Sequence, residues 1–92
     1  MVIIVKRKGH KEKFDEKKTY ASIYAACASA DYSEQTCERI AKEITRKIER
    51  QVVGKKEIAS TLLRRKIEAE LKKKSKELAF YYEQHLPNLN KL

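Results

Sequence analysis

Glycine, proline and cysteine are scarce in this sequence, which has two glycines, one proline and two cysteines among 92 residues. With so few glycines, it contains no Gly-rich phosphate loop of the kind that joins a strand to a helix. Cys27 and Cys37 lack the paired spacing and the neighbouring histidines of a zinc site, so we expect both to be buried free thiols. The sequence therefore predicts neither a phosphate loop nor a metal site.

Long apolar runs are also missing. The apolar run near the start, Val2–Val5, is far shorter than the core of a signal peptide. No other stretch approaches the length that a helix needs to cross a bilayer. We therefore expect a cytoplasmic protein that makes no contact with a membrane.

Catalytic patterns are missing as well. His10 and His85 lie far apart in the sequence, and neither belongs to a motif that pairs a nucleophile with a base. The paired carboxylates fall on amphipathic helix faces, where pairing with lysines and arginines explains them. We expect a domain that is not an enzyme.

Positive charge is what the sequence has in excess. Lys and Arg number 22 against 13 Asp and Glu, which gives a net charge of +9 at pH 7. Two segments, residues 6–18 and 55–76, carry this excess, whereas residues 31–50 have equal numbers of each sign. So strong a charge on one small domain favours anionic partners, from nucleotides to nucleic acids.

The first eighteen residues predict a β-hairpin followed by a helix start. The β-branched run Val2–Val5 is typical of a strand, Lys6–Gly9 of a turn with glycine in the left-handed region, and His10–Phe14 of a return strand. Asp15 then follows as an N-cap. Further along, Val52–Val53 offers a third short strand for the hairpin.

Apolar residues at helical spacing predict four helices. We expect the first over Glu16–Ser29 and the second over Glu34–Arg50. The third follows Gly54, opens with Lys55 and Lys56, and ends at Lys72–Lys74; the fourth is capped by Ser75 and runs to Pro87. The sequence thus predicts one mostly helical α+β domain over residues 1–86, with residues 87–92 as the start of a linker or a truncated end.

Lysines in the first turns of two helices are physically unusual, because helix N-termini already carry partial positive charge. Lys17 and Lys18 occupy such a place in the first helix, and Lys55 and Lys56 are expected to do so in the third. The arrangement becomes favourable if an anion binds there. The alternative is that these are ordinary surface lysines, offset by nearby carboxylates.

The run Val5–Lys18, VKRKGHKEKFDEKK, resembles the opening signature of the ATP-cone domain, in which K-R-x-G is followed after four residues by F-D-x-x-K. Later landmarks of that family also appear, in Ala25-Ala26, in Val53–Ile58 and in the closing Leu78–Tyr82. The resemblance implies a hairpin-led sheet capping a four-helix bundle. It also implies a non-catalytic module that binds ATP or dATP as an allosteric signal.

The resemblance also implies roles for single residues. Lys6, Arg7 and Lys18 match positions that face the nucleotide phosphates. Lys55 stands near the start of the third helix, where the family has a threonine or serine that contributes to the site.

The remaining positions implied by the family concern the base. Glu12 and Asp15 match polar positions near it, with Asp15 having the rival role of N-cap. Ile4 and Val5 match positions that provide backbone and apolar contacts beside the adenine.

The implied partners are an adenine nucleotide, with or without Mg²⁺, and a downstream effector domain or partner protein. Contact with nucleic acid through that partner, and association with further copies of the chain, stay open. Two alternative functions also stay open: a basic helical domain that binds nucleic acid directly, and a cone with a weakened site that serves only for docking.

Overall fold

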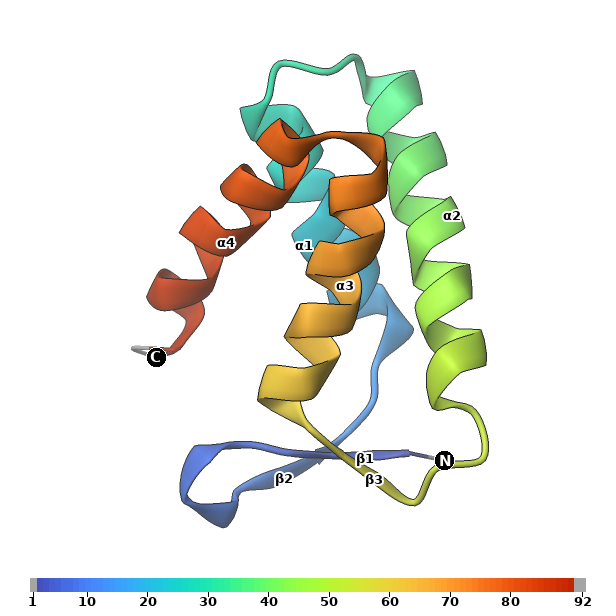
Figure 1. Cartoon of the computed structure of the whole chain (residues 1–92), viewed down its shortest axis with the longest axis vertical. Coiled ribbons are helices and arrows are strands. Elements are labelled where there is room, and N and C mark those ends of the chain that lie inside the picture. Colours follow the sequence, from blue (N-terminus) through green and yellow to red (C-terminus); the bar gives the residue numbers. More distant parts are fainter. Residues whose placement is uncertain (1, 91–92) are drawn as a thin grey trace.

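The computed structural model describes residues 2–90, with side chains described as far as Gln84. Three short strands and four helices make up the fold (Figure 1). In chain order, they are β1 (Ile3–Val5), β2 (Lys11–Lys13), α1 (Glu16–Ser29), α2 (Glu34–Val52), β3 (Glu57–Ala59), α3 (Ser60–Lys74) and α4 (Lys76–Asn90). A single turn of 3-10 helix, Arg7–Gly9, joins β1 to β2.

The expected hairpin is present. β1 and β2 pair antiparallel, with Ile4 opposite Glu12. At the turn, Gly9 has a φ of 80°, in the left-handed region predicted for it, and Lys8 also lies there with a φ of 66°. The Lys6 amide donates to the His10 carbonyl at 2.7 Å and closes the turn.

The third strand exists, but the prediction of its place was wrong. β3 is Glu57–Ala59, and it pairs parallel with β1 on the side away from β2, with Ile58 beside Ile4. Val52 instead ends α2, where its side chain is buried, whereas Val53 is exposed. Ile58 is buried beside Ile4 on the inner face of the sheet, and this long-range packing fixes the place of the third strand.

This strand also corrects the start of the third helix. α3 begins at Ser60, so Lys55 and Lys56 lie in the connection before β3 and do not open a helix. The amide of Lys55 donates to the carbonyl of Val52 in the turn that follows α2. The argument from two lysine-bearing helix starts therefore holds only for Lys17 and Lys18.

The helix boundaries are otherwise close to expectation. α1 matches its predicted range, and the Asp15 carboxylate caps it by accepting a hydrogen bond from the Lys17 amide at 2.9 Å. Ser75 accepts from the amides of Glu77 and Leu78, as expected of a cap. α2 runs two residues past the predicted Arg50, and α4 continues past the predicted Pro87 to Asn90. A proline inside a helix removes one backbone hydrogen bond and crowds the carbonyl four residues earlier, which kinks or ends most helices, but the range of α4 includes Pro87.

The helices form a ring in which α1 packs on α2 and α4, and α3 packs on α4 and α2. The sheet lies across one end of this bundle (Figure 1). The largest fully buried side chains are Ile23, Ile44, Ile48, Leu71 and Leu78. Both cysteines are buried free thiols, as predicted, and burial raises the pKa of Cys27 to about 11. The predicted fold class, mostly α with a hairpin-led sheet, is confirmed.

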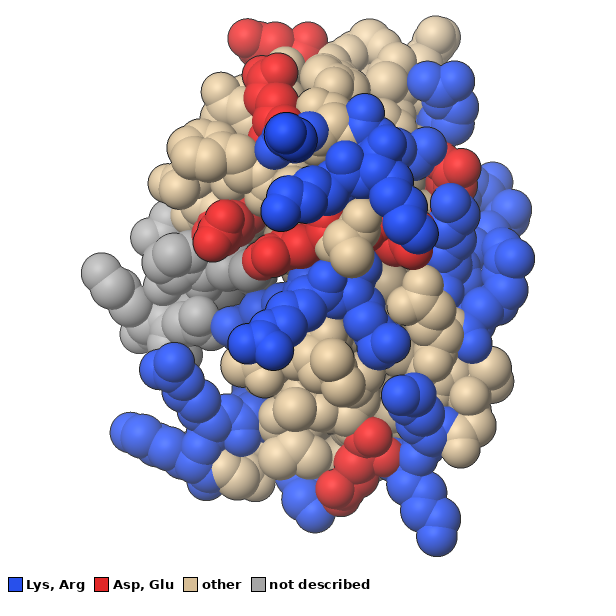
Figure 2. Space-filling model, in the orientation of Figure 1, with Lys and Arg blue, Asp and Glu red and all other residues tan. Residues whose placement is uncertain are grey.

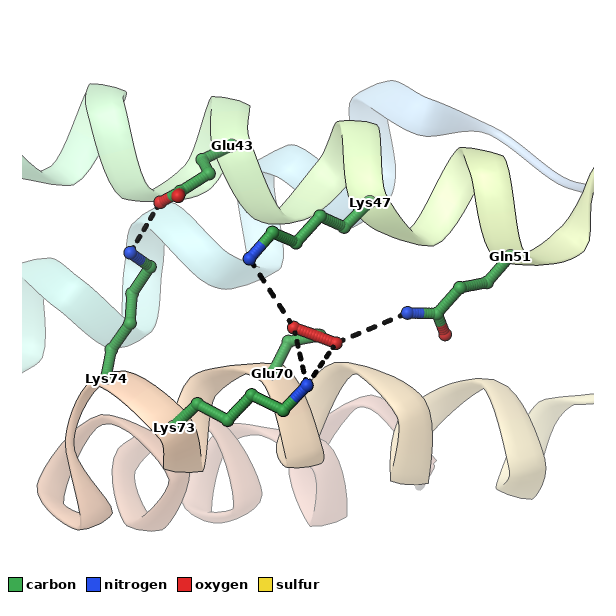
Figure 3. Close-up of polar contacts among 6 residues, drawn as sticks. All are labelled: Glu43, Lys47, Gln51, Glu70, Lys73 and Lys74. Atoms are coloured by element: carbon green, nitrogen blue, oxygen red, sulfur yellow. Dashed lines mark hydrogen bonds and ion pairs between the residues drawn. The ribbon is translucent and has the colours of Figure 1, made fainter.

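A buried carboxylate ties α2 to α3. Glu70 is 8% exposed and accepts hydrogen bonds from Gln51 and Lys73, each at 3.3 Å, while Lys47 lies 3.8 Å away (Figure 3). Burial by itself raises the pKa of Glu70, but Lys73, Lys47 and Gln51 outweigh it and hold that pKa below its ordinary value. The carboxylate is therefore ionised at neutral pH, and it joins the two helices from which these partners come.

Candidate functional site

The face of the sheet that looks toward the helices carries the candidate site. Side chains alternate along a strand, and Val2 and Ile4 are both buried at 7% exposure, whereas Ile3 and Val5 are only half-buried. The backbone of Lys6 stays extended, so Lys6 continues on the same face as Ile4. Glu12 lies opposite Ile4 and shares that face.

Two lysines converge on the Glu12 carboxylate. The ammonium of Lys6 lies 3.1 Å from Glu12 Oε2, and that of Lys18, in the first turn of α1, lies 3.7 Å from the same atom. The side chains of Lys6, Glu12 and Lys18 are 46%, 32% and 70% exposed, so a ligand can reach all three. The structure thus brings together three of the predicted site residues, two cations and one anion.

The other predicted residues are placed differently. Ile4 packs into the core beneath this cluster, while Val5 directs its side chain to the opposite face and has only its backbone available. Asp15 is engaged as the N-cap of α1. Arg7 lies in the hairpin turn and is exposed.

Lys55 is not brought to the cluster by the sheet. It precedes β3 at the end where Glu57 pairs with Ile3, whereas Lys6 follows the other end of β1. Ser60 and Thr61 are the residues at the Lys6 end, because Val5 pairs with Ala59. Sequence reasoning missed them, although Ser and Thr immediately before the apolar residues of a helix, here Leu62 and Leu63, are a known signal of a helix start.

The N-terminus of α3 has the properties of an anion site. It has no side-chain cap and no acidic residue in its first turn, in contrast with α1 and α2, which have both. Its amides are therefore left with partial positive charge. By strand register, this helix end lies next to the backbone of Lys6.

Two carboxylates meet beside the start of α1. Glu49 of α2 shares a hydrogen bond with Glu16, and this contact, helped by desolvation and by the charge of Glu16, raises the pKa of Glu49. A raised folded pKa means that the stability gained is present at low pH and is lost as the pH rises through that pKa. At neutral pH the pair is repulsive.

Replacing Glu49 by glutamine should therefore stabilise the fold at neutral pH. We expect Tm to rise by about 1–4 °C at pH 7, since exposed charge pairs contribute a few tenths of a kcal/mol, and to be unchanged near pH 3.5. Thermal unfolding followed by circular dichroism at both pH values measures this. Glu38→Gln, an equal change on the outside of the same helix, should not raise Tm; a rise in both variants at pH 7 would argue against the Glu16 contact as the cause.

Within residues 2–84, no three potential metal-binding side chains gather into a group. None of the described helices is long and apolar enough to cross a membrane.

Fold and site together define a small helical bundle, closed at one end by a sheet whose inner face presents a cationic cluster. A family model described as the ATP cone domain matches residues 2–83, and the chain belongs to that family. Domains of this family are nucleotide-binding regulatory modules that bind ATP or dATP and are not themselves catalytic. No curated protein matches the chain in a sequence search.

Proposed function

We propose that this domain binds ATP or dATP on the inner face of its sheet and passes the signal to an attached or associated effector domain. The observation that carries the proposal is the convergence of Lys6 and Lys18 on the single carboxylate of Glu12, in a chain of the ATP cone family. Two cations held by one anion leave a net positive charge for a phosphate group to neutralise.

The phosphates are assigned to Lys6 and Lys18, with Arg7 reaching in from the hairpin turn. The uncapped start of α3, with Ser60 and Thr61, supplies further donors at the Lys6 end of the sheet. A phosphate is favoured at such a helix end because its amides and its dipole both attract negative charge. Lys55 retains a role only through the family resemblance.

The base and sugar are assigned to the hairpin side of the cluster. Ile4 provides the apolar floor, and Val5 contributes through its backbone. Glu12 accepts hydrogen bonds from the ligand once the phosphates have taken over its two lysines. Asp15 acts by fixing the start of α1 and so the place of Lys18.

The remaining parts of the proposal concern the setting of the domain. The nucleotide acts with or without Mg²⁺, in the cytoplasm, and its effect is expressed by the effector domain or partner protein. We assign residues 1–86 to the cone. Association with a second copy, or contact with nucleic acid through the partner, is part of how such a signal can be read out.

Calorimetric titration with ATP, dATP, ADP and AMP, with and without Mg²⁺, tests the proposal. We expect both triphosphates to bind more tightly than AMP and to stabilise the fold by about 2.7 kcal/mol at a hundredfold excess over Kd. This corresponds to a rise in Tm of about 10 °C or more. No heat and no shift in Tm at millimolar nucleotide, with a normally folded protein, would leave the domain as a docking module.

A further inference from the structure

The outward side of α2, a helix that contributes nothing to the cluster of Lys6, Glu12 and Lys18, carries a stripe of positive charge. Arg39, Lys42, Arg46 and Arg50 follow one another at intervals of three or four residues, which places them on one side of the helix. All four are exposed. Figure 2 shows Lys and Arg side chains along the edge of the molecule that α2 forms in Figure 1.

This stripe forms one wall of a groove of about 720 Å³ between α2 and the junction of α3 with α4. Lys74, at the end of α3, adds a fifth cation from the other wall. Glu43, the one carboxylate among the described residues that line the groove, is already paired with Lys74 at 2.5 Å (Figure 3). We name the four α2 cations together with Lys74 the basic groove.

The α2 cations are poorly neutralised. Among the described side chains, none of the four has an ion pair within 4.0 Å. Beyond ion-pair distance, the charge of Arg39 helps to lower the pKa of Glu43, and the charge of Arg46 acts in the same direction on the pKa of Glu49. By contrast, Lys6, Lys18, Lys47 and Lys73 each lie within that distance of a carboxylate.

Such a stripe has a cost for the isolated helix. Like charges three or four residues apart destabilise a helix by about 0.2–0.5 kcal/mol per pair, and the stripe contains three such neighbouring pairs. A polyanion bound along α2 reverses this cost. Three of the cations are arginines, whose planar fork suits phosphate better than a lysine does.

We propose that the basic groove binds the phosphate backbone of a nucleic acid. A protein interface built around an apolar core fits it poorly, because the exposed side chains of this stripe are all charged. Little apolar surface is open in the groove: Ile40 is 6% exposed and Leu78 is fully buried, and Tyr32 is partly buried. The exposed apolar side chains, Val53, Leu62 and Phe80, do not line it.

The dimensions of the stripe also match an extended polyanion. The twelve residues from Arg39 to Arg50 are separated by eleven rises of about 1.5 Å and so span about 16 Å along the helix axis. One strand of a duplex places a phosphate about every 3.4 Å of its axis, so several phosphates fit along this length. Binding by phosphate contacts alone has no strong sequence preference and does not depend on the proposed nucleotide site.

Fluorescence anisotropy with a labelled oligonucleotide, single-stranded and as a duplex, tests this. With four phosphates neutralised, affinity should fall by about 100-fold between about 50 and about 200 mM salt. The double variant Arg46→Gln, Arg50→Gln should bind more weakly at low salt, and the slope of log affinity against log salt should become shallower by about 2.

The matched control is Arg65→Gln, Lys76→Gln, which removes the same charge from exposed positions on α3 and α4. It should keep the wild-type salt slope and most of the affinity. If both double variants lost the same oligonucleotide affinity, the oligonucleotide would be responding to the net charge of the protein and not to the basic groove, which would overturn the proposal. So would the absence of binding at low salt, or equally tight binding of polyglutamate of matched charge.

Discussion

Alanine at both Lys6 and Lys18 should weaken ATP binding by about 100-fold or more. In the proposed complex each ammonium makes a charge-assisted contact with a phosphate, of the kind that contributes about 1.5–3 kcal/mol. A loss of about 2.7 kcal/mol or more is a hundredfold change in Kd. The fold should be unaffected, because both lysines are well exposed and ion pairs of this kind contribute little to stability. Calorimetric titration with ATP, together with thermal unfolding of the free variant, measures both quantities.

The hairpin itself offers a matched control. Lys11 and Lys13 stand opposite Val5 and Ile3, so they lie on the outer face of the same strands, and both are exposed. The double variant Lys11→Ala, Lys13→Ala removes the same charge from the outer face of the hairpin. It should leave ATP affinity within about twofold, because salt largely screens exposed charges that do not contact the ligand. Equal losses in the two double variants would place the nucleotide elsewhere.

The single variant Glu12→Gln then separates two roles of the carboxylate. If Glu12 chiefly neutralises Lys6 and Lys18 in the free protein, the variant should bind ATP more tightly, because the phosphates no longer compete with a carboxylate for the two lysines. If Glu12 holds the sugar or base, as the family resemblance implies, the variant should bind all adenine nucleotides more weakly. We expect the weaker binding, with AMP affected as much as ATP.

The hairpin, the caps and the helices could be predicted because their signals are local. Asp15 and Ser75 act on amides two or three residues away, and the buried faces of α1 and α2 follow from 3.6-residue spacing. β3 could not be predicted in the same way. Its three residues carry one buried side chain, Ile58, which fits the start of a helix as well as it fits a strand. Only its parallel pairing with β1, more than fifty residues earlier, decides between the two.

The same limit applies to the candidate site and to the basic groove. Lys6, Glu12 and Lys18 come from a segment short enough for the resemblance to fix their register, and the fold brings them together. The role of Lys55 rested on a helix start that β3 displaces to Ser60. The basic groove was invisible to segment charge, since residues 31–50 carry equal numbers of each sign. It arises only when the helix separates the arginines from the glutamates.

Replacing Leu71 by alanine should destabilise the domain more than any other change considered. Leu71 is fully buried on α3, and removing such a side chain costs about 2–5 kcal/mol through lost burial and the cavity that remains. A domain of this size is stable by only about 5–14 kcal/mol. We expect Tm to fall by about 10–30 °C, with a lower midpoint and an unchanged slope in urea unfolding.

Leu62 provides the comparison within the same helix. Its side chain is 43% exposed, so Leu62→Ala removes the same atoms from α3 with little loss of buried surface and no closed cavity. We expect this variant to cost less than about 1 kcal/mol. Neither leucine belongs to the cluster of Lys6, Glu12 and Lys18 or to the basic groove. Saturating ATP should therefore raise the Tm of both variants by a similar amount. Similar losses from the two substitutions would mean that α3 does not pack with Leu71 inward.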